Sequence, residues 1–289
     1  MSIYENPDAN YLEINRANWD SRVELHLQGY KLDQFRSDPN FISDVVRFDL
    51  ERYPNLKGLR GIHFQCHIGT DTISLSRLGA QMFGLDLSPK SVEAANNLSS
   101  ELKSNAKFVE GEVYSAASFL QDAGVELGFD FVYTGVGALC WLPDIEKWAR
   151  AVKSVLRPGG FLFIREAHPV MWTLAAERED GGIALEYDYF AGPGLLLEVE
   201  DTYAGDGKVQ SPASVSFNHS LSQIFNALWG QGFEIDLFEE HNSVPWKPWD
   251  KDFEEDPSTA EFHLKDRPNR LPASYTLKAT LKEDNKSKI

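Results

Sequence analysis

GIHFQCHIGTD, at residues Gly61–Asp71, is followed by an amphipathic run and then by MFGLDLS, at Met82–Ser88. The first segment has the pattern of an apolar strand and a tight turn, the run predicts a helix, and the second segment predicts another strand. Asp86 lies at the end of that second strand. In a parallel α/β sheet, a carboxylate at this place can accept hydrogen bonds from both hydroxyls of a ribose. The sequence therefore indicates a site for a nucleoside-containing ligand.

The alternation of strands and helices continues over residues 56–168. Ser88-Pro89 predicts a helix start with proline in the first turn. Phe129–Tyr133 is a short apolar strand, and apolar residues recur at helical spacing in Ile145–Leu156. Arg157–Ile164 predicts a Pro-Gly-Gly turn followed by another apolar strand. Such alternation is typical of a doubly wound, mostly parallel sheet.

Four segments are expected along the chain. Residues 1–55 are predicted to form an N-terminal helical lid, and residues 56–168 the cofactor-binding α/β core. Residues 169–217 are expected to be an insertion of antiparallel strands, and residues 218–282 the C-terminal part of the core with a Pro/Trp-rich loop. The first core helix is expected to begin at Thr70 or Asp71, since either is a good N-cap. The predicted strands outside the first core segment are 183–190, 195–203, 209–217, 233–238 and 274–281.

Composition excludes several classes of protein. The chain has 289 residues, 42% of them hydrophobic, which is enough for a packed core. Its formal net charge of -16 argues against a nucleic-acid partner, because binding phosphates requires a basic surface. No signal-like N-terminus and no apolar run of membrane-spanning length is seen, so no membrane association and a cytoplasmic location are expected. The oligomeric state is left open.

The two cysteines, Cys66 and Cys140, form neither a disulfide framework nor a CxxC motif. His63, Cys66 and His67 are metal-ligating residue types. However, a strand followed by a turn is expected to scatter their side chains, so no metal site is predicted.

The first turn discriminates among nucleoside cofactors. A nicotinamide or flavin dinucleotide requires GxGxxG there, so that the backbone can approach a pyrophosphate. Residues 65–69 contain one glycine, which disfavours that class. S-adenosylmethionine carries no phosphate, so its demands on the turn are looser.

Over residues 59–169 the chain resembles the class I S-adenosylmethionine-dependent methyltransferases. The motifs that carry the resemblance are Gln65–Gly69 at the first turn, Asp86, Gly111–Val113, Phe129–Val132 and Leu156–Gly160. His63–Thr72, together with Phe217–Leu221, looks like a subgroup with a variant, glycine-poor first motif. In this variant His63 replaces an acidic residue, and Gln65 and His67 replace glycines, although residues other than glycine disfavour a positive φ.

The resemblance implies a class I methyltransferase-like fold, which is a doubly wound, mostly parallel α/β sheet with an antiparallel strand insertion and an N-terminal helical lid. It implies S-adenosyl-L-methionine as cofactor, with Asp86 on the ribose, an acidic residue near the adenine, and Gly69 where the backbone approaches the ligand. The residues expected to bind the cofactor are Gln65, Cys66, Gly69, Thr70, Asp86, Leu87, Glu112, Val113, Thr134, Gly135 and Val136.

Two histidines are candidate catalytic bases. His168 directly follows the fifth strand, at the sheet edge where ligands bind, and His219 opens a later helix. Structural hydrogen bonding is the alternative for His168. Trp19, Tyr30 and Trp172 lie outside the core and are candidates for an apolar or aromatic substrate pocket, with packing of a lid as the alternative.

The sequence thus predicts a methyltransferase that transfers a methyl group to a small-molecule acceptor. A non-catalytic protein that binds S-adenosylmethionine is the main alternative, and a nucleotide-dependent oxidoreductase is a weaker one. The acceptor, and whether its O, N or C atom is methylated, is left open.

Overall fold

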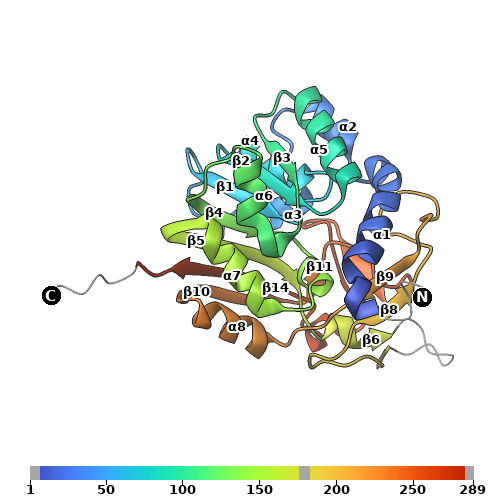
Figure 1. Cartoon of the computed structure of the whole chain (residues 1–289). Coiled ribbons are helices and arrows are strands. Elements are labelled where there is room, and N and C mark those ends of the chain that lie inside the picture. The colour runs from blue at the N-terminus through green and yellow to red at the C-terminus, as the bar shows by residue number, and fades with distance from the viewer. Residues whose placement is uncertain (1–6, 176–182, 284–289) are drawn as a thin grey trace.

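A seven-stranded sheet forms the centre of the protein (Figure 1). The structure is a computed structural model that describes residues 7–175 and 183–283. The strand order is β3-β2-β1-β4-β5-β14-β10. Only β14 runs antiparallel to its neighbours β5 and β10 within this sheet, which confirms the predicted mostly parallel fold. The strands are β1 Arg60–Phe64, β2 Gln81–Asp86, β3 Lys107–Glu110, β4 Phe129–Thr134, β5 Leu156–Ala167, β10 Phe233–His241 and β14 Ser274–Leu281.

Helices cover both faces of this sheet. One apolar cluster joins the sheet to α6, α7 and α8, and a second joins it to α4 and α5 and to the short helices α2 and α3. The bounds are α2 Leu32–Ser37, α3 Asp44–Phe48, α4 Thr70–Arg77, α5 Pro89–Glu101, α6 Ala116–Asp122, α7 Ile145–Val155 and α8 Leu221–Gly230. The result is the three-layer arrangement of doubly wound proteins.

Of the predicted starts of helices α5 and α4, the first is found in the structure and the second is not. Ser88 caps α5 as predicted, because its hydroxyl accepts a hydrogen bond from the backbone N–H of Ser91 at 3.0 Å. Helix α4 instead begins with Gly69 at the N-cap, at φ 80°, and neither Thr70 nor Asp71 has that role. The side chain of Asp71 is therefore available for another function.

A 23-residue helix, α1 (Pro7–Gly29), packs along β9 and α5. It is joined to β9 by Asn15, whose side-chain amide donates to the Val215 carbonyl at 3.0 Å and accepts from the Val215 N–H at 2.8 Å. The amide thus pairs with the backbone of β9 as a neighbouring strand would. This contact holds a polar face of α1 against the rest of the protein.

The predicted strands of the insertion are much shorter than expected. The structure has β6 Leu174–Ala175, β7 Ala184–Leu185, β8 Leu195–Glu198 and β9 Ala213–Ser216, paired as β6 with β7 and β8 with β9. Leu185 and Phe190 are largely exposed. Because these two side chains remain exposed, an extended strand would bury little apolar surface there.

The Pro/Trp-rich segment 244–272 is not simply a loop. It forms most of a three-stranded antiparallel sheet of β11 Ser243–Val244, β12 Phe253–Asp256 and β13 Glu261–Leu264. The buried guanidinium of Arg165 in β5 anchors this sheet, since it contacts both carboxylate oxygens of Glu261 at 2.7 Å. The small sheet is thereby held beside the carboxyl edge of the main one.

Candidate functional site

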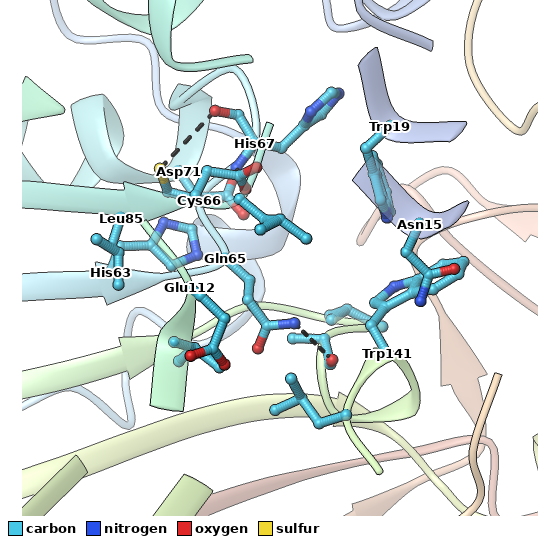
Figure 2. A pocket seen from close by; sticks show the side chains of 18 of the residues that line it. Asn15, Trp19, His63, Gln65, Cys66, His67, Asp71, Leu85, Glu112 and Trp141 are labelled. Atoms are coloured by element: carbon cyan, nitrogen blue, oxygen red, sulfur yellow. Dashed lines mark hydrogen bonds between the residues drawn. The ribbon is translucent and has the colours of Figure 1, made fainter. Parts of the chain in front are cut away.

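A cavity of about 130 Å³ lies at the carboxyl ends of four neighbouring strands, β3, β2, β1 and β4. We call it cavity 1. Parallel α/β sheets bind ligands at this edge. Figure 2 shows Asn15 and Trp19 of α1 facing Gln65 and His67 of the first turn across it. The other residues expected to bind the cofactor that line it are Cys66, Thr70, Asp86, Leu87, Glu112, Val113, Gly135 and Val136.

The carboxylate of Asp86 is held at the end of β2 by backbone donors. One oxygen accepts from the N–H of His67 at 2.7 Å and the other from the N–H of Ser88 at 2.9 Å. Burial raises the pKa of Asp86 to about 6, and these two hydrogen bonds oppose the rise. Each oxygen keeps a second lone pair. The same carboxylate can therefore order the turn and accept hydrogen bonds from a ligand.

The first turn uses non-glycine residues in the left-handed region. Gln65 has φ 57° and His67 has φ 49°, so both take the conformation that glycine adopts without strain. Tertiary contacts compensate for the backbone strain at these two residues. The side-chain amide of Gln65 donates to the Ala138 carbonyl at 2.8 Å, and the backbone N–H of His67 binds Asp86.

Gly69, one of the residues expected to bind the cofactor, does not line cavity 1. A β-carbon at this position would lie 2.5 Å from the ring of Phe108 and 3.1 Å from the β-carbon of Ala95. Close packing of the turn on β3 and α5, together with the positive φ, requires glycine here.

Two further cofactor candidates, Glu112 and Thr134, differ in their relation to cavity 1. Glu112 lines cavity 1, but its carboxylate caps the short turn after β3 by accepting from the N–H groups of Tyr114 and Ser115 at 2.8 and 3.1 Å. Thr134 is fully buried at the end of β4 and does not line the cavity, whereas Gly135 and Val136 after it do.

Cavity 1 is strongly anionic. Among the described residues its lining includes three carboxylates, Asp71, Asp86 and Glu112, and no lysine or arginine. Burial raises the pKa of Asp71 to about 6, and the hydroxyl of Ser43 opposes this. Burial lowers the pKa of His63 to about 3, so this imidazole is neutral at physiological pH. Such a lining favours a ligand that carries positive charge.

A second and larger cavity, of about 660 Å³, adjoins the first, and we call it cavity 2. All three predicted substrate residues line it, and Trp19 and Tyr30 line both cavities. Trp172 stacks on Trp246 of the Pro/Trp-rich segment, with ring centroids 6.0 Å apart and an interplanar angle of 11°. The walls also include aromatic side chains from the N-terminal segment, the loop after β4, the insertion and β13, namely Phe35, Phe41, Trp141, Tyr203 and Phe262.

Sequence reasoning missed a polar cluster between α1 and the first turn. Nδ1 of His26 lies 2.8 Å from Nε2 of His67, and Nε2 of His26 lies 2.6 Å from the hydroxyl of Thr202 in the insertion. A sequence signal existed, because residues 15, 19, 22, 26 and 30 are spaced by three or four and share one face of a helix. What that face contacts could not be inferred from the spacing.

Neither predicted catalytic histidine lines cavity 1 or cavity 2. Nδ1 of His168 accepts from the N–H of Val170 at 3.2 Å, and its Nε2 lies 3.1 Å from Glu240. Nε2 of His219 lies 2.6 Å from the carbonyl oxygen of Leu142. Both residues are buried: His168 follows β5, which lies between β4 and β14 in the sheet, and His219 lies just before α8. These contacts fit the structural alternative stated for His168, and His219 is likewise held by contact with a backbone carbonyl.

In the part of the chain that the structure describes, no group of three or more His, Cys, Asp or Glu side chains is arranged to hold a metal ion. Cys66 is buried, and His63 and His67 turn to different partners, Thr72 and Ser91. Of the described helices, none is both long and apolar enough to cross a membrane.

Comparison with known proteins bears on this site. Residues 62–162 match the family described as "Methyltransferase domain". A ubiquinone biosynthesis O-methyltransferase from Cupriavidus pinatubonensis is 31% identical over 111 residues, which are 38% of this chain. The match spans 41% of the length of that relative.

Solved structures show the same fold. An S-adenosylmethionine-dependent methyltransferase from Mesorhizobium loti superposes with a TM-score of 0.56 at 19% identity, covering 82% of this chain and 98% of the other. One from Clostridium acetobutylicum superposes with a TM-score of 0.55 at 12% identity, covering 83% and 91%. The likeness in fold therefore extends well beyond the matched domain.

Proposed function

We propose that this chain, whose residues 62–162 match the methyltransferase-domain family, is an S-adenosylmethionine-dependent methyltransferase that methylates a small molecule. S-adenosylmethionine binds in cavity 1, with the ribose hydroxyls on Asp86. The acceptor binds in cavity 2 and receives the methyl group where the two cavities meet. Asn15 and Trp19 of α1, with the insertion, cover the bound molecules.

The observation that carries the choice of cofactor is the charge of cavity 1. Its three carboxylates, without a lysine or arginine among the described lining residues, would repel the pyrophosphate of NAD or FAD. S-adenosylmethionine has a sulfonium and an ammonium against one carboxylate, so it carries net positive charge. The glycine-poor turn acts in the same direction, since Gln65 and His67 project side chains where a pyrophosphate would need bare backbone.

The nature of the acceptor is inferred from cavity 2. Its volume of about 660 Å³ suits a small organic molecule, and its indole and phenyl walls favour a planar, largely apolar one. Positioning of such an acceptor against the sulfonium and exclusion of water would supply much of the rate acceleration.

Thermal-shift titration tests the cofactor. S-adenosylhomocysteine should raise the melting temperature and NAD and FAD should not; the reverse ranking would reject the proposal. Transfer of a labelled methyl group to a panel of planar phenols and amines then separates an enzyme from a protein that only binds the cofactor. Binding of S-adenosylhomocysteine without transfer to any member would favour the non-catalytic alternative.

A further inference from the structure

The two cavities meet at a small set of shared residues, and Asp71 is the one carboxylate among them in the described part of the chain. It is the second residue of α4, whose N-cap is Gly69. The carboxylate is therefore not consumed in capping the helix. It lies beside the loop that follows β4.

Gly135 in that loop lines cavity 1 beside two polar side chains, His63 and Asp71. A β-carbon built on it would lie 3.3 Å from Nε2 of His63 and 3.6 Å from Oδ2 of Asp71. His63 is 3% exposed, and its Nε2 has no hydrogen-bond partner in the structure. Its Nδ1 lies 2.9 Å from the hydroxyl of Thr72. In the tautomer whose Nδ1–H donates to Thr72, Nε2 is an unused acceptor directed at the same space as the carboxylate.

The order of the strands indicates which end of the cofactor reaches this space. Cavity 1 runs along β3, β2, β1 and β4, a span of roughly 14 Å at 4.7–4.9 Å per strand. With the ribose on Asp86 at β2 and the adenine toward Val113 after β3, the remaining part of an extended cofactor extends to β1 and β4. That part is an amino acid, with one ammonium and one carboxylate group.

We propose that Asp71, assisted by Nε2 of His63, binds the α-ammonium of the cofactor's amino-acid end. The inference rests on the proposed function. An ammonium has three N–H donors, and the space over Gly135 offers two acceptors, one of them anionic. A carboxylate at the same place would meet Asp71 at close range with no cation among the described lining residues to offset it.

The test is a calorimetric binding cycle at pH 7.5 with two probes, S-adenosylhomocysteine and its analogue lacking the α-amino group. The wild-type protein should bind S-adenosylhomocysteine about 10- to 100-fold more tightly than the analogue, the range of a charge-assisted hydrogen bond. Asp71→Asn should remove most of that difference, by weakening the binding of S-adenosylhomocysteine and leaving the affinity for the analogue within about threefold.

Two control variants test whether the change in preference between the two probes is specific to Asp71. Asp86→Ala should weaken both probes together and keep their ratio. Asp122→Asn should change neither, because Asp122 is an exposed residue at the end of α6 and lines neither cavity.

Equal binding of the two probes by the wild-type protein would overturn the proposal even if Asp71→Asn failed to fold. An Asp71→Asn variant that still prefers S-adenosylhomocysteine to the analogue as strongly as the wild-type protein does would also overturn it. An Asp71→Asn variant that keeps wild-type binding of both probes but loses methyl transfer would instead assign Asp71 to proton removal from the acceptor. Failure of the wild-type protein to bind S-adenosylhomocysteine at all would reject the proposed function itself.

Discussion

Nδ1 of His26 in α1 lies 2.8 Å from Nε2 of His67 in the first turn, so two imidazoles from residues 41 apart share one hydrogen bond. The outer nitrogens of the pair contact the hydroxyls of Thr202 and Ser91. This chain of contacts joins α1, the first turn, the insertion and α5. Burial and the nearby Arg22 lower the pKa of His26 to about 3, and burial likewise lowers the pKa of His67 well below 6.5.

The pair of His26 and His67 should make the free energy of unfolding depend on pH. A histidine whose pKa is lower in the folded than in the unfolded state contributes stability that is present above pH 6.5 and is lost as the pH falls toward 3. Replacing His26 by Gln should therefore flatten the decline of the unfolding free energy between pH 7 and pH 5. The expected change is up to about 1.4 kcal/mol per pH unit for one histidine.

Urea denaturation at several pH values measures this slope. His263→Gln is the control, since Nδ1 of His263 contacts the carbonyl of the adjacent Leu264 in β13. Asp71 and Asp86 change the pH dependence of stability in the opposite direction. Their pKa values are raised to about 6 in the folded protein, so the stability that they contribute at low pH is lost as the pH rises through that value. The difference between variant and wild type isolates the histidine. An unchanged slope in His26→Gln would show that the pair does not couple folding to pH.

Asp86→Ala should weaken the binding of S-adenosylhomocysteine strongly. The loss of two charge-assisted hydrogen bonds to the ribose, each worth about 1.5–3 kcal/mol at most, predicts an affinity at least tenfold lower by calorimetry. Glu110→Ala is the matched control, because Glu110 pairs in register with Asp86 on the neighbouring strand and its side chain is exposed outside cavity 1. Similar affinities in the two variants would remove Asp86 from the ribose.

The requirement for glycine at position 69 is predicted to be steric as well as conformational. Gly58 and Gly69 have nearly the same φ, 81° and 80°, but a β-carbon on Gly58 would have no atom within 4 Å. Gly58→Ala should cost about 1–2 kcal/mol for the left-handed conformation alone. Gly69→Ala should cost about 1–3 kcal/mol more, because the added carbon meets the ring of Phe108. Equal shifts in the urea midpoint would contradict the packing role.

His168 and His219 are predicted to stabilise the fold without contacting either ligand. Replacing each by Asn should lower the melting temperature and leave the affinity for S-adenosylhomocysteine within about twofold. The reason is that each ring contacts buried structure outside cavity 1 and cavity 2. A variant with wild-type stability and a tenfold loss of methyl transfer would restore the role of general base to that histidine.

The amino-acid sequence by itself determined the α/β core and the position of Asp86. Strand and helix periodicities are local, and the Ser88-Pro89 start of α5 and the span of β14 at Ser274–Leu281 follow from neighbouring residues alone. A carboxylate at the end of a parallel strand must lie at the ligand-binding edge, whatever the rest of the chain does.

Only the tertiary structure decided what surrounds that edge. His26 and Thr202 are 176 residues apart, and Tyr30 and Tyr203 are 173 apart, yet both pairs are in hydrogen-bond contact. The strands β11 to β13 likewise depend on pairing with one another and on Arg165. No local pattern encodes such contacts, because their free energy comes from surfaces that exist only after the core has formed. The same holds for Asp71, whose exposure to the two cavities depends on Gly69 taking the N-cap position of α4.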